Sequence, residues 1–192
     1  MHVNIKKEEK EMRKDIEKMQ FLPLPVLIIG TYDKQGKANA MNAAWGGIYD
    51  HGHIFISLSK HKTTENLEIK KAFTVSFATK ETEMISDYFG VASGRNEDKI
   101  EKSGVHVTKS NFVDAPIIEE YPLTLECTVE SFEGGNLIGK VENCSIDEKY
   151  IDENGKIDID KMELITYDMT DNTYRVLGGI VGKAFSDGLK LK

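Results

Sequence analysis

Short apolar runs of strand length, separated by turns that contain glycine or asparagine, dominate the chain beyond Pro25. Residues 123–130 alternate apolar and polar side chains, Gly134-Gly135-Asn136 follows, and a second run occupies residues 137–142. This alternation predicts strands with one face in the core and the other in water, and the turn predicts a hairpin. Residues 26–29 and 37–42 are expected to form a second hairpin around the turn at residues 33–36, and further strands are expected at residues 53–59 and 73–78. The sequence therefore predicts a mainly β fold with short helices, arranged as an antiparallel barrel.

Helical patterns are few and short. Apolar residues spaced three and four apart predict an amphipathic helix within residues 6–20, so residues 1–20 are interpreted as an N-terminal helical segment. Pro23 and Pro25 are expected to end it. Further helices are expected near residues 64–70, 83–89 and 96–102, with Gly90 stopping the second of these. One principal domain is then expected to span residues 21–192.

Composition and charge exclude several classes of function. The 192 residues carry a formal net charge of -7, with 32 acidic against 25 basic residues. A net basic face is needed to neutralise phosphates, so a general nucleic-acid-binding role is not expected. No secretory signal and no stretch near the roughly 20 apolar residues of a membrane span is found. With two cysteines, Cys127 and Cys144, in no metal or redox spacing, the sequence predicts a cytoplasmic protein away from membranes, with Cys127 a buried core thiol.

Several familiar motifs fail on an essential residue. Residues 134–140 read G-x-x-x-x-G-K, but Val141 follows where a P-loop needs a hydroxyl, and the segment is expected to be a hairpin. Residues 178–182 are glycine-rich but lack the first glycine and the βαβ context of a dinucleotide-binding fingerprint. The acidic turn at residues 152–158 lacks calcium-loop ligands, and His51 and His53 lack a third metal ligand. We therefore expect no metal site and no local signature of a catalytic side chain.

A run of small residues at the end of a predicted strand is the first candidate site. Small side chains let a ligand approach the backbone, whose N–H groups can donate to a flat heteroaromatic ring, and the single tryptophan offers apolar contact. The alternative is that the alanines pack under a core tryptophan. The run comprises Asn39, Ala40, Met41, Asn42, Ala43, Ala44 and Trp45.

A strand that leads into a helix is the second candidate. The N–H groups of a first helical turn can bind an anion, Lys62 adds a charge, and Thr63 adds a hydroxyl. The alternative is plain N-capping by Thr63 or Thr64 with solvated lysines. A ring-sized apolar patch beside a phosphate site would suit a mononucleotide. The candidate residues are Ser57, Leu58, Ser59, Lys62 and Thr63.

Several segments of the chain carry recognisable residues in a recognisable order. They are residues 39–45, 57–67 with His61-Lys62-Thr63-x-x-Asn66, 73–76, 87–90, Ser93-Gly94-Arg95, Asp98-Lys99, 115–119 and 125–127. In the order of these segments as well as in their residues, the chain resembles the flavin reductase-like family over about residues 20–185, and especially its flavoredoxin branch.

The resemblance implies a split β-barrel of Greek-key type that binds FMN non-covalently, as a homodimer with the flavin near the interface. The segment from Asn39 to Trp45 would lie along the isoalloxazine ring and ribityl chain. Ser57, Ser59, Lys62 and Thr63 would hold the phosphate, and Ser93, Gly94 and Arg95 would complete the site from the same or the partner subunit. The family's common Thr is Asn42 here. The glycines of residues 178–183 resemble the family's closing segment and are expected to allow close backbone packing.

The chemistry that the resemblance implies belongs chiefly to the cofactor, so no side-chain acid or base is required. The expected function is an FMN-dependent oxidoreductase that passes electrons from NADH, NADPH or a reduced carrier to a small acceptor. The alternatives are an FMN-binding electron-transfer protein without nicotinamide turnover, and a ligand-binding module without redox activity.

Overall fold

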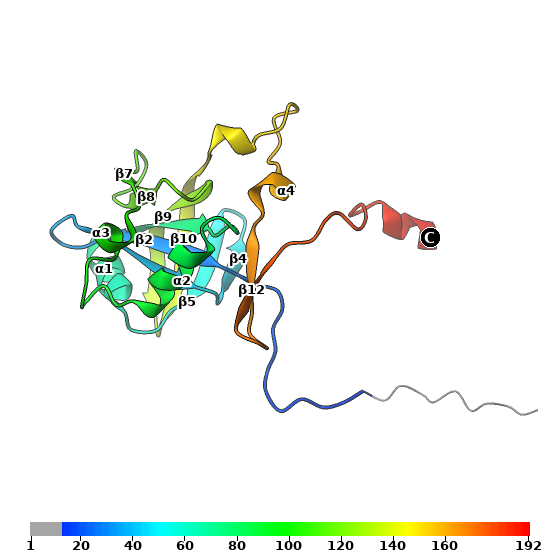
Figure 1. The fold of residues 1–192 in the computed structure, drawn as a ribbon, viewed down its shortest axis with the longest axis horizontal. Helices are drawn as coiled ribbons and strands as arrows, with labels where there is room; N and C mark the ends of the chain where they lie inside the picture. Colours follow the sequence, from blue (N-terminus) through cyan, green and yellow to red (C-terminus); the bar gives the residue numbers. More distant parts are fainter. Residues whose placement is uncertain (1–12) are drawn as a thin grey trace, which may run out of the picture.

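The centre of the molecule is a curled antiparallel sheet of seven strands (Figure 1). The computed structural model describes residues 13–192. The strand order is β3-β2-β6-β9-β10-β5-β4, and each strand is antiparallel to its neighbours. The predicted mainly β class is confirmed. The strands are β2 (Leu27–Tyr32), β3 (Ala38–Ala43), β4 (Gly46–Asp50), β5 (His53–Ser57), β6 (Ala72–Phe77), β9 (Leu123–Glu133) and β10 (Asn136–Ile146).

Local turn chemistry produces the two hairpins expected from the sequence. Between β2 and β3, the Asp33 carboxylate accepts hydrogen bonds from the N–H groups of Gln35 and Lys37, both at 2.9 Å. Between β9 and β10, Gly134 and Gly135 have φ values of 59° and 86°, which favour glycine. The P-loop look-alike is thus a hairpin turn, as predicted. The Gly135 carbonyl also accepts from the Leu58 N–H at 2.7 Å, which fixes the chain where it leaves β5.

The concave side of the sheet encloses an apolar core. Phe73 is completely buried there, and Gly139 on β10 allows it to be, because a Cβ on Gly139 would lie 2.4 Å from the Phe73 ring. Cys127 is buried in the same cluster, as predicted, and burial raises the pKa of its thiol to about 12. The cluster comprises Leu27, Ile29, Met41, Ile56, Leu58, Leu67, Phe73, Val75, Cys127 and Leu137.

A second layer covers part of the outer face, so the prediction of a solvated polar face on β9 is wrong for the first half of the strand, although Glu130 is exposed as predicted. Thr124 and Glu126 on that face are buried. The Glu126 carboxylate accepts hydrogen bonds from Ser110 and from the Asn143 amide, which compensates its desolvation. Sequence alternation reports polarity but not whether a distant segment covers it. The covering elements include α2 (Glu83–Val91), α3 (Lys99–Ser103), β7 (Val107–Lys109) and β8 (Pro116–Ile118), whereas α1 (Lys62–Lys70) packs its Leu67 into the concave cluster.

A small third sheet stands beside the barrel and was not foreseen from the sequence. It pairs β1 and β12 on either side of β11, which brings residues near 24 and 176 together. Beyond Leu177 the chain extends away from the body (Figure 1). Its elements and the adjoining helical turns are β1 (Leu24–Pro25), η1 (Glu148–Tyr150), α4 (Ile159–Met162), β11 (Ile165–Asp168), β12 (Thr173–Val176) and η2 (Asp187–Leu191).

Three local expectations are corrected. Residues 13–20 form no helix, and the rest of the predicted N-terminal helix lies outside the described residues. Helix α2 continues through Gly90 to Val91, so Gly90 does not stop it, and a Cβ at Gly90 would make only ordinary contact with Asn42, at 3.4 Å. Gly178 and Gly179 have nothing within 4 Å of an added Cβ, so the expected close packing is wrong for them, whereas a Cβ on Gly182 would lie 2.9 Å from the Asp187 carboxylate. No helix within residues 13–192 is long and apolar enough to cross a membrane.

Candidate functional site

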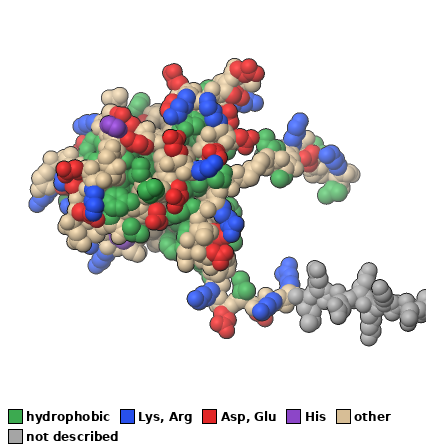
Figure 2. Space-filling model, in the orientation of Figure 1, with side chains coloured by type: hydrophobic (Ala, Val, Ile, Leu, Met, Phe, Trp, Pro, Cys, Tyr) green, Lys and Arg blue, Asp and Glu red, His purple; other side chains and the backbone are tan. Residues whose placement is uncertain are grey.

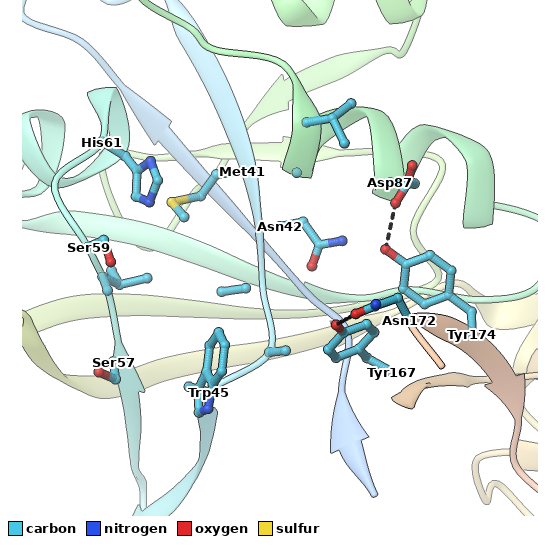
Figure 3. Close-up of a pocket in the computed structure, with 15 residues that line it drawn as sticks. Met41, Asn42, Trp45, Ser57, Ser59, His61, Asp87, Tyr167, Asn172 and Tyr174 are labelled. Carbon is cyan, nitrogen blue, oxygen red and sulfur yellow. Dashed lines mark hydrogen bonds between the residues drawn. The ribbon is translucent and has the colours of Figure 1, made fainter. Parts of the chain in front are cut away.

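Strand β3, the β5–α1 loop and helix α2 enclose one continuous groove with two parts, of which Figure 3 shows the first. The first part, about 450 Å³, is lined by Trp45, Tyr167 and Tyr174 and is called the aromatic part. The second, about 420 Å³, is lined by Lys62 and Lys99 and is called the cationic part. Ligand pockets usually measure about 300–1,000 Å³. The two parts share walls, formed by Met41, Asn42, His61, Gly90 and Val91.

The aromatic part has a wall of small side chains at the end of β3. Ala43, Ala44 and Trp45 line it, with Ser57 at the end of β5 and Ser59 on the loop that follows (Figure 3). Trp45 is 55% exposed, which rules out the alternative of a core tryptophan. A flat ring can therefore approach the backbone here and contact an aromatic side chain.

The β11–β12 hairpin closes the other side of the aromatic part with polar aromatic groups. The Tyr174 hydroxyl donates to Asp87 on α2 at 2.9 Å, and the Tyr167 hydroxyl donates to Asn172 at 2.7 Å (Figure 3). Burial, followed by the hydrogen bond to Asp87, raises the pKa of Tyr174, so this phenol stays protonated. Sequence reasoning missed these groups, because the hairpin lies more than 120 residues beyond β3 and carries no recognisable motif.

The cationic part lies at the N-terminus of α1. Residue 61 is the N-cap, and its N–H donates to the Thr64 hydroxyl at 3.0 Å. The alternative of capping by Thr63 or Thr64 holds in part, because Thr64 completes this cap, whereas the Thr63 hydroxyl accepts from the Asn39 amide at 2.9 Å. The first-turn N–H groups have no acceptor within the helix and carry its positive dipole end. Burial, then Lys99 and Arg95, lower the pKa of His61, so its imidazole is neutral at pH 7.

Lys99 is a buried cation of this part that was not selected from the sequence. The residue is 4% exposed, and its Nζ donates to the carbonyls of Phe89 at 3.0 Å and Ala92 at 3.3 Å. An ammonium has three N–H donors, so one remains for a ligand in the groove. Burial lowers the pKa of Lys99 to about 8. The residue stands in the Asp98-Lys99 pair of the family resemblance, which was the one available signal.

Most of the residues expected to form the site line the groove. They are Asn39, Met41, Asn42, Ala43, Ala44, Trp45, Ser57, Leu58, Ser59, Lys62, Thr63, Ser93 and Gly94. Ser57 and Ser59 line the aromatic part, apart from the Lys62 and Thr63 corner with which they were grouped.

Two of the expected residues lie outside the groove wall. Ala40 is completely buried in the opposite cluster around Phe89, because successive side chains of a strand point to opposite faces. Arg95 points to Glu65 instead, with its guanidinium 2.6 Å from that carboxylate.

The donor set fits a phosphate monoester joined to a flat ring. Two lysines and a helix N-terminus occupy one end, and small and aromatic side chains occupy the other. The 93–94 loop is pressed against this corner, since a Cβ on Gly94 would lie 2.2 Å from the Asn39 side-chain oxygen. Within residues 13–192 no cluster of three His, Cys, Asp or Glu side chains could hold a metal ion. FMN has the required shape and charge, so the residues present fit it.

Comparison with known proteins also points to a flavin reductase-like protein. A family model described as a flavin reductase like domain matches residues 19–167. The flavoredoxin of Desulfovibrio vulgaris (Miyazaki F) is 31% identical, with a TM-score of 0.88, and the match covers 92% of this chain and 100% of that one. A flavoredoxin from Methanosarcina acetivorans is 28% identical, with a TM-score of 0.84, covering 95% and 100%. No curated protein matches this chain.

A more distant structure supports the fold alone. The FMN-binding domain of a flavin reductases-like enzyme from Shewanella baltica is 19% identical, with a TM-score of 0.73, covering 83% of this chain and 88% of that one. The expected FMN-binding split-barrel fold is thereby confirmed. Because the family model covers most of the chain and two flavoredoxins align along nearly all of it, the chain belongs to the flavin reductase-like family.

Proposed function

We propose that this chain is an FMN-dependent oxidoreductase that passes electrons from NADH, NADPH or a reduced carrier to a small acceptor. The observation that carries the proposal is the polarity of the groove. Its cationic part offers Lys62, Lys99 and the α1 N-terminus, while its aromatic part offers a wall of small residues and aromatic rings. In a chain with a formal net charge of -7, this concentration of cations at a helix N-terminus favours an anionic ligand.

The chain's own residues bind and orient the cofactor. Lys62, the Lys99 ammonium and the first-turn N–H groups of α1 would hold the phosphate. The backbone at Ala43 and Ala44 would lie along the ring, with Trp45 beside it. Bound FMN supplies the electron chemistry, and the protein supplies position and electrostatics. Tyr174, held by Asp87, presents a protonated hydroxyl to the same space.

The exposed side of the aromatic part favours a second candidate function. Trp45 is half exposed, so the ring end of the groove is open to other molecules. That opening admits a nicotinamide, and it also suits direct electron exchange with another protein. An FMN-binding electron-transfer protein without nicotinamide turnover is therefore the alternative, and the flavoredoxin relatives are consistent with it.

Rapid mixing of the FMN-loaded protein with NADH and with NADPH, under anaerobic conditions, decides between the two functions. The oxidoreductase loses its flavin absorbance near 450 nm with at least one donor, at a rate that depends on donor concentration. A carrier keeps its absorbance with both donors and loses it only with a reduced protein or a chemical reductant. A chain that binds FMN but cannot be reduced by any donor would contradict both functions.

The assembly and cellular location belong to the same proposal. A homodimer is supported by large apolar side chains exposed on β4, namely Ile48 and Tyr49. A cytoplasmic location is supported by two cysteines that remain free, Cys127 in the core and Cys144 at the surface.

A further inference from the structure

The last residues of the chain form an arm that carries apolar side chains into solvent. The arm, residues 178–192, leaves the body beyond β12 and extends away from it (Figure 1). Ile180 is 88% exposed, and Val181 and Phe185 are completely exposed. Figure 2 shows hydrophobic and basic side chains along this projection. A cluster of large apolar residues left in water is a sign of a surface that another molecule covers.

The arm has local order of its own, and only its root, residues 178–180, lies beside the body, where it lines a groove with residues 152 and 157–160. The Asp187 carboxylate accepts from the Lys183 N–H at 2.8 Å and pairs with the Lys190 ammonium at 3.0 Å. The hydrogen bonds that the structure shows for residues 178–192 all join residues of the arm. The last link to the body is the Leu177 N–H, which donates to the Leu164 carbonyl at 3.0 Å.

The body has a matching apolar surface where the curled sheet is left open. This surface, called the barrel mouth, is lined mainly by Pro25, Leu27, Ile48, Ile54, Phe55 and Phe77. Ile48 stands on the edge strand β4 and is 88% exposed. Edge strands with exposed apolar residues tend to pair with another chain unless something covers them.

The root of the arm lies beside the barrel mouth. Leu177 lines a second apolar groove together with Pro25 and Phe77, and both of these residues also line the mouth. In a two-fold symmetric dimer the same patch of each copy faces the other. If the two mouths face each other, each arm starts at the interface and points toward the second copy.

The distribution of charge also favours a second copy of the chain as the partner of the arm. The arm has a formal charge of +2, from Lys183, Lys190, Lys192 and Asp187. Because the whole chain has a formal net charge of -7, the residues before the arm have a formal charge of -9. A basic, apolar arm complements an acidic body with an apolar opening. The body of a second copy has both properties.

We propose that two copies of this chain exchange residues 178–192, so that the arm of each copy lies over the barrel mouth of the other. The proposal rests on the homodimer proposed above and adds the element that holds it together. An exchanged arm removes Ile180, Val181 and Phe185 from water and covers Ile48 and Phe55 in the same step.

Three full-length variants with one introduced carboxylate each test the exchange. Phe185→Glu alters the arm and Ile48→Glu alters the mouth. Phe112→Glu is the matched control, because Phe112 is an exposed apolar residue in the loop between β7 and β8, on the side of the body away from the arm. Light scattering on a sizing column reports whether each protein has a mass of 21.6 kDa or twice that value. Equal melting temperatures show that the variants are folded.

The exchange predicts that the arm and mouth variants each weaken dimerisation at least about tenfold, as expected for an interface anchor, while the control dimerises as the parent does. Mixing the two weak variants should restore dimers, since a mixed pair keeps one intact arm on one intact mouth. If mixing restores nothing, each arm acts on its own copy and the exchange is wrong. If Phe185→Glu dimerises normally, the exchange is wrong and the homodimer stands. A parent protein that is monomeric contradicts both, but leaves the FMN proposal intact.

Discussion

The side-chain amide of Asn39 donates a 2.9 Å hydrogen bond to the Thr63 hydroxyl, which joins strand β3 to the first turn of helix α1. Both residues are buried, at 8% and 1% exposure. The two segments that the sequence marks as candidate sites are thus tied together by one bond between them. The bond therefore holds the small-residue wall of β3 in position relative to the first-turn N–H groups of α1.

Removing this bond should loosen both segments. In Asn39→Ala the Thr63 hydroxyl loses its buried donor, so the free energy of unfolding should fall by about 1–3 kcal/mol. Urea denaturation of Asn39→Ala, Thr63→Val and the double variant measures this free energy of unfolding. Because the two side chains are partners, the double variant should lose less stability than the sum of the single variants. Strict additivity would mean that the bond contributes nothing.

The cationic part should matter for FMN binding, and the histidines on β5 and its preceding turn should not. Lys62→Ala combined with Thr63→Ala removes a charge and a positioning hydroxyl, and should raise the dissociation constant for FMN at least about tenfold. The matched control is His51→Ala combined with His53→Ala, since His53 pairs with Glu130 at 2.7 Å and neither histidine lines the groove. Equal dissociation constants for the two double variants would refute the phosphate assignment.

Lys99 should make FMN affinity depend on pH above neutrality. Its pKa is lowered to about 8, so the ammonium deprotonates in the free protein as the pH rises through that value. A phosphate monoester is a dianion there, because its second pKa is about 6. The pKa of His61 and of nearby Glu97 is lowered too, so neither group titrates in this range. FMN affinity should therefore fall severalfold from about pH 7.5 to 9.5.

Riboflavin and two lysine variants isolate this effect. Riboflavin has no phosphate, so its affinity should change little over the same pH range. Lys99→Met should abolish the pH dependence of FMN binding, whereas Lys102→Met, at an exposed lysine paired with Glu97, should retain it. The stability of the FMN-free protein should change with pH in the opposite direction to its FMN affinity. Between pH 8 and about 10.4, Lys99 binds more protons in the unfolded chain than in the folded protein. The FMN-free protein should gain stability from Lys99 as the pH rises through that window.

The thermal stability of the protein should depend on glycine at position 139, beside the core residue Phe73. A Cβ at this position would lie 2.4 Å from the Phe73 ring, so Gly139→Ala forces the ring or the strand to move. Overpacking of this kind typically costs about 1–3 kcal/mol. Thermal unfolding should show a lower midpoint for Gly139→Ala and a nearly unchanged one for Gly47→Ala, because nothing lies within 4 Å of a Cβ at Gly47. Equal midpoints would show that the contact with Phe73 relaxes without cost.

Segments with local patterns could be predicted from the sequence. The β2–β3 and β9–β10 hairpins, helix α1 and the wall from Ala43 to Trp45 all follow from turn residues, spacing or small side chains within a few positions. Strand periodicity could also have excluded Ala40, since seven successive strand residues cannot all face one ligand. The family resemblance outweighed that rule.

Groups brought in by distant segments could not be predicted. Tyr167 and Tyr174 reach the groove because β11 pairs with β1 at the other end of the chain. Lys99 enters it because its ammonium binds carbonyls at the end of α2. Glu126 is buried because the segment carrying Ser110 covers its face of the sheet. In each case tertiary contact, and not local pattern, decides the position.

The most direct test of the account is the absorbance of the purified protein during titration with FMN. The account predicts saturable binding of one FMN per chain, with a flavin spectrum that stays with the protein on a desalting column. It also predicts that riboflavin, which lacks the phosphate, binds at least about tenfold more weakly. A protein that remains colourless after FMN is added, or that binds FMN and riboflavin equally, would contradict it.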